Sequence, residues 1–143
     1  MLGVFSALEI SASGLGAERV RMNTIASNLA NVHTTRTPEG GAFRRLDPVF
    51  EAVGLNGVSD PFAAQSGVSR VNVSSIAADT RPGTMVYEPG HPDANAEGYV
   101  EYPNVNAVEE MVNMITASRA YEAGITSIES VKQIARSALG IGK

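Results

Sequence analysis

The residue types that most often perform acid–base or metal chemistry are sparse in this sequence. It holds two histidines, His33 and His91, and no cysteine. His91 lies in the segment 89–93 (PGHPD), where two prolines and a glycine favour a turn. A metal site or an acid–base centre needs convergent partners, and no second histidine or cysteine is spaced to supply them. We therefore interpret His91 as a turn residue, and the sequence predicts neither a metal nor a cofactor.

Two pairs of acidic residues, Glu109/Glu110 and Asp93/Glu97, could serve as the acid and base of a glycan-cleaving enzyme. Adjacent residues on a helix project about 100° apart, so Glu109 and Glu110 do not face one another. We interpret them as acids at the start of a helix, where the helix dipole favours negative charge. No Gly-x-Ser-x-Gly elbow and no phosphate-binding glycine loop occurs. The sequence thus predicts a protein that is not an enzyme.

The charge balance argues against nucleic acid as a partner. The 143 residues include 11 Lys and Arg against 15 Asp and Glu, a formal net charge of -4. Nucleic-acid binding depends on neutralising phosphates with basic side chains. The pair Arg44-Arg45 could grip an anionic surface, but Asp47 and Glu51 weaken its field. No apolar run reaches the ~18 residues of a membrane span, and the first residues lack the basic and apolar regions of a cleavable signal peptide.

Both ends of the chain carry an apolar pattern that is typical of long helices. The pattern repeats with alternating steps of three and four residues, the a/d seam of a coiled coil. It predicts helices over about 3–31 and about 106–138, paired as a coiled-coil-like stalk. The seam residues are Phe5, Leu8, Ala12, Leu15, Arg19, Met22, Ala26 and Leu29 in the first helix, and Met114, Ala117, Tyr121, Gly124, Ile128, Val131, Ala135 and Ala138 in the second.

The middle of the chain reads as short strands and turns. We expect a small, mostly antiparallel β region of three to five strands inserted between the helices, at one end of their stalk. The fold class is α+β, with an N-terminal helix segment (1–35), a β-rich middle (36–105) and a C-terminal helix segment (106–143). Strands are expected at 42–53, broken at Asp47-Pro48, and at 68–76, 85–88 and 99–102, with 54–67 left without regular structure.

Asparagines mark the inner ends of both predicted helices. Asn31 should end the first helix, since asparagine tolerates the left-handed conformation common just past a helix end. Asn28 lies on the same face, and either caps the helix by hydrogen bonds or contacts another subunit. Asn106 is a good N-cap for the second helix, with Glu109 as its capping-box partner.

Apolar residues also fall outside the seam, so each helix should have a second contact face. Head-to-tail contacts that do not close a ring generate a helical filament. We therefore favour pairing of the helices within one chain together with extensive packing between chains. The off-seam residues are Ile10, Val20, Ile25, Val32, Met111, Val112, Ile115 and Ile125. The predicted assembly interface comprises Leu8, Leu15, Met22, Asn28, Leu29, Asn31, Met111, Met114, Tyr121, Ile128 and Val131.

Three segments resemble a known family. Residues 13–35 (SGLGAERVRMNTIASNLANVHTT) closely resemble the N-terminal signature of bacterial flagellar rod and hook proteins. Residues 90–106 (GHPDANAEGYVEYPNVN) resemble a segment typical of the proximal-rod members. Residues 108–122 (VEEMVNMITASRAYE) resemble the shared C-terminal signature. The segment from about Gly54 to Ser75 carries no motif of this kind.

The resemblance implies a structural subunit of the flagellar basal body. Such proteins pass unfolded through the type III export apparatus without a cleaved signal and polymerise in the periplasm into a hollow rod. The rod surrounds the export channel and transmits torque from rotor to hook, and the terminal helices line it. The implied partners are copies of the chain itself, FlgB- and FlgF-type rod proteins, a FliE-type adaptor at the rotor ring and the export apparatus.

Three other hypotheses stay open at this point. The first alternative is that the chain is a short rod subunit of a different type from the proximal-rod members that residues 90–106 resemble. A small peptidoglycan-directed enzyme would suit a structure that crosses the cell wall, and replacing Asp93 or Glu97 by alanine should then abolish its activity. A free-standing coiled-coil adaptor would form a defined small oligomer. Because a free monomer cannot cover its apolar stripes, we also expect both termini to order largely on assembly.

Overall fold

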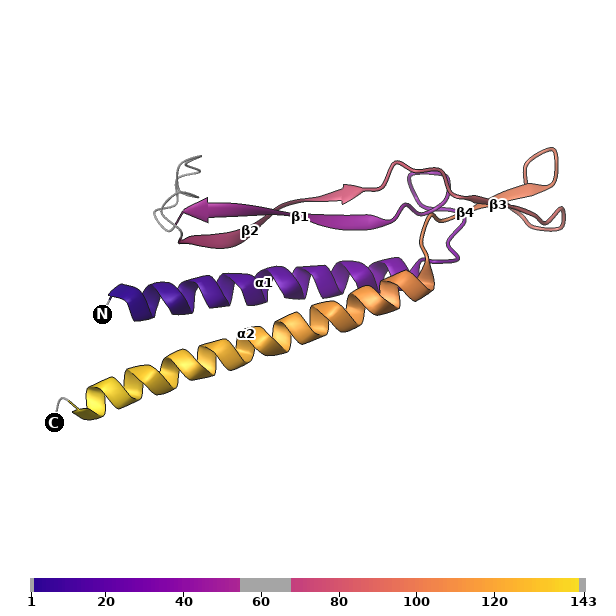
Figure 1. Cartoon of the computed structure of the whole chain (residues 1–143). Helices are drawn as coiled ribbons and strands as arrows, with labels where there is room; N and C mark the ends of the chain where they lie inside the picture. Colours follow the sequence, from indigo (N-terminus) through magenta and orange to yellow (C-terminus); the bar gives the residue numbers. More distant parts are fainter. Residues whose placement is uncertain (1, 55–67, 142–143) are drawn as a thin grey trace.

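The computed structural model describes residues 2–54 and 68–141 as an elongated α+β molecule (Figure 1). Two long helices at the chain ends flank two antiparallel β ribbons, which confirms the predicted fold class. The expected lack of regular structure at 54–67 lies outside the described residues, except for Gly54, which ends a strand. The elements are α1 (Leu2–Ala30), β1 (Leu46–Gly54), β2 (Ser69–Ala78), β3 (Thr84–Tyr87), β4 (Tyr99–Tyr102) and α2 (Ala107–Ile141).

The helices α1 and α2 run antiparallel, so both ends of the chain lie at the same end of the molecule (Figure 1). The predicted seam of α2 faces inward: Ala117 is buried, and Met114, Tyr121 and Ile128 are half-buried. Gly124 lets the helices approach closely, because a Cβ atom at this position would lie 2.7 Å from Cδ2 of Leu15. The pairing of the two helices within one chain is thus confirmed.

The predicted seam of α1 is half wrong. Leu8, Leu15, Met22 and Leu29 are half-buried, but the alternate seam positions Phe5, Ala12, Arg19 and Ala26 are exposed. The physical reason is that α1 lies between α2 and the β1–β2 ribbon and therefore covers two partners at once. Its buried residues, Ala17, Thr24, Ile25 and Asn28, lie toward these two partners, away from the exposed stripe.

The β1–β2 ribbon lies along α1, whereas the sequence predicted the β region at one end of the stalk (Figure 1). Side chains of α1 hold the ribbon from below. The backbone N–H of Val71 donates to Oγ of Ser13 at 3.0 Å, and Arg70 pairs with Glu9 at 3.4 Å. Among the described strands, only the β3–β4 ribbon projects beyond the end of the helix pair.

The first strand is continuous through Asp47-Pro48, where the sequence predicted a break. Pro48 stands opposite Ile76 in the antiparallel register, and the irregularity comes one step later, between Val49 and Phe50. Proline is tolerated here because β1 pairs with a single neighbour, so the edge of the ribbon needs no donor from Pro48. The predicted strands at 68–76, 85–88 and 99–102 are confirmed as β2, β3 and β4 within one to two residues.

The helix ends follow the predicted residues but not always the predicted geometry. Oδ1 of Asn106 accepts the backbone N–H of Val108 at 3.0 Å, which confirms it as the N-cap of α2. Asn31 follows the last residue of α1 without the expected left-handed conformation, since no non-glycine residue of the described chain has a positive φ. Instead its side chain donates at 2.9 Å to the carbonyl of Ser27, which also accepts the Asn31 backbone N–H at 3.1 Å, so Asn31 closes the last turn twice.

Candidate functional site: a buried polar cluster and an exposed helix face

A polar cluster of Asn28, Arg45 and Glu110 joins three elements at the closed end of the helix pair. Asn28 and Glu110 are each 0% exposed. The Asn28 amide group donates to Oε2 of Glu110 and to the carbonyl of Leu46, both at 2.9 Å. Its oxygen accepts the Leu46 backbone N–H at 2.9 Å. One side chain of α1 therefore binds the first residue of β1 and the first turn of α2 together.

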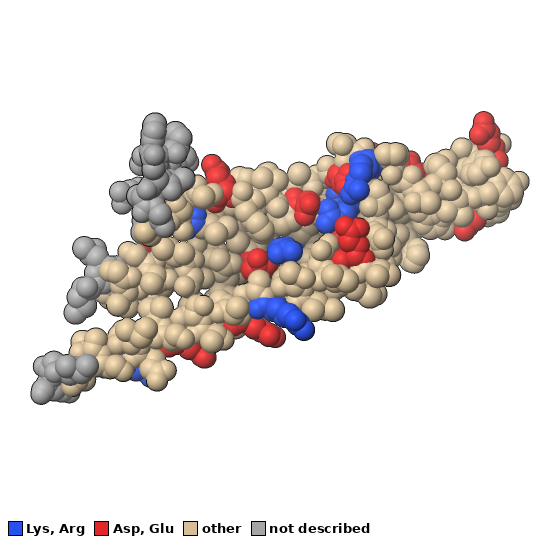
Figure 2. Space-filling model, viewed as in Figure 1, with Lys and Arg blue, Asp and Glu red and all other residues tan. Residues whose placement is uncertain are grey.

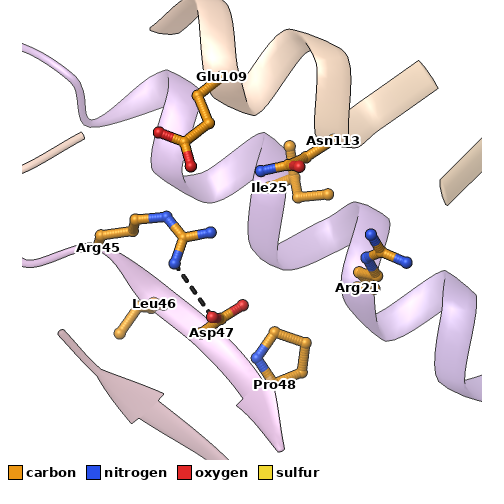
Figure 3. A pocket seen from close by; sticks show the side chains of 8 residues that line it. All are labelled: Arg21, Ile25, Arg45, Leu46, Asp47, Pro48, Glu109 and Asn113. Carbon is orange, nitrogen blue, oxygen red and sulfur yellow. Dashed lines mark hydrogen bonds and ion pairs between the residues drawn. The ribbon is translucent and has the colours of Figure 1, made fainter. Parts of the chain in front are cut away.

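Arg45 supplies the countercharge for the buried Glu110. Its Nε donates to Oε1 of Glu110 at 2.8 Å, and a second guanidinium nitrogen pairs with Asp47 at 3.1 Å. Figure 3 shows the Arg45 side chain reaching toward Asp47 beside α1. Burial disfavours the Arg45 charge, but the hydrogen bonds to Glu110 and Asp47 and the attraction of both carboxylates outweigh it, so the pKa of Arg45 is raised.

The polar cluster extends into the loops through backbone contacts. The backbone N–H of Arg45 donates to Oδ1 of Asn104 at 2.8 Å, and the Asn104 amide donates to the Arg81 carbonyl at 3.0 Å. Arg81 in turn donates from its side chain and backbone to Asp79, which lowers the Asp79 pKa from 3.8 to about 2. The β2–β3 connection is thereby fixed to the start of α2.

This arrangement positions three elements relative to one another. Both Glu110 oxygens accept hydrogen bonds from neighbouring side chains, and the carboxylate is 0% exposed. A cavity of about 340 Å³ lies beside the cluster, and charged and polar groups from all three elements surround it (Figure 3). Among residues 2–54 and 68–141 no group of His, Asp and Glu side chains could hold a metal ion.

Two of the residues considered for acid–base chemistry, His91 and Asp93, have structural partners. Nδ1 of His91 accepts the Asp93 backbone N–H at 3.0 Å, as in a turn. The Asp93 carboxylate pairs with Arg36 and accepts the Thr35 hydroxyl at 2.8 Å. Glu97 is exposed and does not line the cavity that Asp93 lines with Glu101. Asp93 and Glu97, the pair named for the enzyme hypothesis, therefore do not both line this cavity.

Most of the predicted assembly residues are at least half-buried within the single chain, and their role in assembly stays a prediction. Nine of them are half-buried, and Asn28 is fully buried. Oδ1 of Asn31 accepts a hydrogen bond from the Thr34 hydroxyl, and the Asn31 amide group caps the end of α1. Met111 is the exposed member, at 55%. The half-buried residues are Leu8, Leu15, Met22, Leu29, Asn31, Met114, Tyr121, Ile128 and Val131.

Sequence reasoning missed Arg45 and the buried role of Glu110. A signal for Glu110 was present, because extending the α2 seam four residues back from Met114 lands on it. An acid on the inward face of a helix needs a countercharge, and this requirement points to one of the arginines in the loop after α1. No pattern in the sequence separates Arg45 from its neighbour Arg44, which instead pairs with Glu101 at 3.2 Å.

The outer face of α2 is apolar and uncovered near its start. Val108, Met111, Val112 and Ile115 are 71%, 55%, 57% and 56% exposed, and they lie on the side of the helix away from α1. Large apolar side chains grouped on one helix face are typical of a contact surface. No helix in the described part of the chain is long and apolar enough to cross a membrane.

Comparison with known proteins identifies the family. Residues 8–36 match the model described as flagella basal body rod protein, and residues 96–141 match flagellar basal body rod FlgEFG protein C-terminal. The chain is 46% identical to the flagellar basal-body rod protein FlgC of Borreliella burgdorferi, covering 98% of each chain. It is 45% identical to that of Aquifex aeolicus, over 94% of this chain and 93% of the relative, and 40% identical to that of Bacillus subtilis, over 97% and 98%.

The two matched segments are the ones that meet in the polar cluster, since Asn28 lies in the first and Glu110 in the second. The relatives are rod proteins and not enzymes, and rod proteins assemble with other flagellar components in the basal body. The hypothesis of a peptidoglycan-directed enzyme is therefore wrong. With relatives of this similarity over nearly its whole length, the chain belongs to the FlgC family of flagellar basal-body rod proteins and is a structural subunit of the rod.

Proposed function

We propose that the chain polymerises through its two helices into a hollow proximal rod that surrounds the export channel and transmits torque from rotor to hook. The observation that carries the proposal is the uncovered apolar face of α2, formed by Val108, Met111, Val112 and Ile115. The side chains of this face gain stability only when another surface covers them. An elongated helix pair with a free apolar face suits lateral packing into a tube.

The polar cluster supports the same proposal by a different route. A shaft must carry load between its inner and outer parts without shearing one against the other. Asn28, Arg45 and Glu110 tie the helix pair to the β1–β2 ribbon by buried hydrogen bonds. Buried, fully paired polar groups define one arrangement of the elements, because any displacement leaves them unsatisfied.

The proposed partners follow from this role. They are further copies of the chain, FlgB- and FlgF-type rod proteins, a FliE-type adaptor at the rotor ring, and the export apparatus that delivers the chain. The proposed location is the periplasmic part of the basal body, reached without a cleaved signal peptide. Contacts with several neighbours should together bury more than the roughly 1,600 Å² of a standard interface.

The experiment is a complementation test in the bacterium that carries the gene. Cells lacking the chromosomal copy are given the wild-type chain or the variant Met111→Asp/Val112→Asp, and purified basal bodies are probed for the chain. We expect the wild type in the rod fraction and the variant excluded, because charges on the α2 face cannot be buried against a neighbour. Absence of the wild type from basal bodies, with normal swimming, would refute the proposal.

A matched control adds a charge outside the helix face. Asn72 is exposed on β2, away from α2, and Asn72→Asp should enter the rod as the wild type does. Circular dichroism on the purified variants checks that each retains its helices. If the Asn72 variant were excluded as strongly as the Met111/Val112 variant, the α2 face would not be the assembly surface.

A further inference from the structure

A longer stripe follows α2 from Met111 to Arg136 with steps of four and three residues, and it shares Met111 and Ile115 with the apolar face. It combines apolar with charged side chains, and all of its members except the half-buried Ser118 are exposed. Met111 and Ile115 are more than half exposed, and Ile125 is 39% exposed. Glu122 and Lys132 have no ion-pair partner in the described part of the chain. Acidic and basic side chains follow one another along this outer edge of α2 (Figure 2).

The free stripe of α1 has the same period. It runs from Phe5 to Ala30 with steps of four and three, and each of its members is exposed. Arg19, near its middle, has no ion-pair partner among the described residues, while Glu9 makes one contact to Arg70 at 3.4 Å. Two helix stripes with one period can pack along their whole length, as in a coiled coil.

The two stripes match in one antiparallel register. Placing Ala26 opposite Ile115 brings Arg19 opposite Glu122, because both partners are seven residues away. The same register brings Gly16 opposite Ile125, so the isoleucine meets a position without a side chain. Opposite charges and complementary sizes therefore coincide.

The register also pairs one more charge, while Glu129 comes opposite Ala12. Glu9 comes opposite Lys132, and Phe5, which is 69% exposed, comes opposite Arg136, where a guanidinium can stack on the ring. A shift by seven residues in one direction places Arg19 against Ile115 and Glu9 against Ile125. A shift in the other direction places Arg19 against Glu129, which is again an acid, but Glu9 against the apolar Leu139. Of these three registers, the first pairs both Arg19 and Glu9 with a side chain of opposite charge.

We infer that the free stripe of α1 binds the free stripe of α2 from a second copy of this chain, with Arg19 opposite Glu122 and Ala26 opposite Ile115. This inference rests on the proposed rod function and adds the partner and the register. The contact is heterologous, since α1 of one copy meets α2 of the next, and each copy keeps both surfaces for further addition. Electrostatic matching of this kind fixes register and excludes other alignments.

The register determines how far neighbouring copies are displaced along the helix axis. Within one chain Leu15 faces Gly124, whereas the contact between copies places Gly16 near Ile125. The second copy is displaced along the helix axis by two residues, or about 3 Å at the rise of an α-helix. A row of copies that climbs by this step does not close into a flat ring but continues as a helix.

Charge reversal tests the register in the full chain. Arg19→Glu and Glu122→Arg each place like charges in contact and should lower the amount of chain recovered in basal bodies by about tenfold. The double variant restores opposite charges between copies and should recover to within about twofold of wild type. Both side chains are exposed, so the variants should keep the helix content of the wild type. Full incorporation of the single variants, or no recovery in the double variant, would overturn the inference.

Disulfide cross-linking tests the neighbour directly, because the natural chain has no cysteine. Two single-cysteine variants, Ala26→Cys and Ile115→Cys, are produced in the same cells, so a disulfide between them can form only between copies. Mild oxidation of purified basal bodies should give a cross-linked dimer. Thr116→Cys replaces Ile115→Cys as the control, since it is the next residue and projects about 100° away.

The outcomes separate this inference from the proposed function. Both variants present in basal bodies without a cross-linked dimer would overturn the inference and leave the rod function intact. A cross-link from Ala26→Cys to a different rod protein, identified by mass spectrometry, would overturn the second copy as partner. Absence of the wild-type chain from basal bodies would refute the rod function itself.

Discussion

Glu110 places a negative charge in the interior at the first turn of α2, and this charge is stable there only because two neighbouring side chains compensate for it. Taking a carboxylate out of water costs several kcal/mol unless hydrogen bonds and a countercharge replace the lost hydration. Asn28 and Arg45 provide both. The adjacent Glu109 is exposed, so two consecutive acids have opposite structural roles.

We predict that Glu110→Gln lowers the free energy of unfolding by about 2–4 kcal/mol. The glutamine oxygen can accept a hydrogen bond from Asn28 or from Arg45, but one oxygen cannot replace both carboxylate oxygens. The substitution also removes the Glu110 charge, so Asp47 becomes the one carboxylate that pairs with Arg45. Urea unfolding followed by circular dichroism measures the change. Glu109→Gln is the matched control and should alter stability by less than about 0.5 kcal/mol. Equal effects of the two substitutions would contradict the role assigned to the polar cluster.

Asp79 should contribute a small acid-sensitive part of the stability. Its pKa falls from 3.8 to about 2 because Arg81 donates hydrogen bonds to the carboxylate. This contribution is complete above the unfolded value of 3.8 and is lost as the pH falls toward 2, because the unfolded chain binds the proton first. The difference in unfolding midpoint between wild type and Asp79→Asn should therefore shrink over this interval. A difference that stays constant down to pH 2 would show that the Arg81 contact is absent in solution.

At the scale of elements, the contact between Leu15 and Gly124 sets how closely α1 and α2 pack. We predict that Gly124→Leu destabilises the helix pair by about 1–3 kcal/mol, because the added side chain overlaps Leu15. The second substitution Leu15→Ala should restore part of the loss by making room. Gly140→Leu is the control, since a Cβ there has no neighbour within 4 Å, and higher helix propensity should make it neutral or slightly stabilising. Thermal unfolding measures all three.

Much of the element order could be predicted from the sequence, and the failures have identifiable causes. The α2 boundary was predictable because Asn106 caps it through its own side chain, a purely local effect. Half of the predicted α1 seam was wrong because α1 packs against the β1–β2 ribbon as well as α2. The residues of the ribbon are distant from α1 in the sequence, so the local apolar pattern does not reveal this second partner. Pro48 looked like a break because its tolerance depends on β1 having one neighbour. For the candidate site, Asn28 could be singled out, but Arg45 could not, because its partner lies 65 residues away.

For the whole molecule, the polar cluster divides a closed end from an open end. At the closed end α1, α2 and the β1–β2 ribbon share buried hydrogen bonds, while Ile134 and Leu139 near the other end of α2 are 64% and 66% exposed. The expectation that both termini order largely on assembly stays a prediction. From the structure, we now expect this ordering in the half of each helix that lies away from the polar cluster.

We predict that amide hydrogen exchange on the purified subunit is slow near Asn28 and Glu110 and fast in the first two turns of α1 and the last three of α2. The closed end opens only when several buried hydrogen bonds break together, whereas the open end has few contacts to lose. In isolated basal bodies the open ends should become protected as well. Equal protection along both helices of the free subunit would contradict this gradient.

The separation of Asn28 and Glu110 along the chain has a consequence for the order of folding. The two residues that share a hydrogen bond are 82 positions apart, so their contact closes a long loop and forms slowly compared with local helix turns. On the proposed export route, a chain released N-terminus first would hold α1 without its partner until residue 110 has emerged. Premature folding inside the proposed export channel would thereby be avoided, because the contact that commits the chain to its native topology needs both of its ends outside.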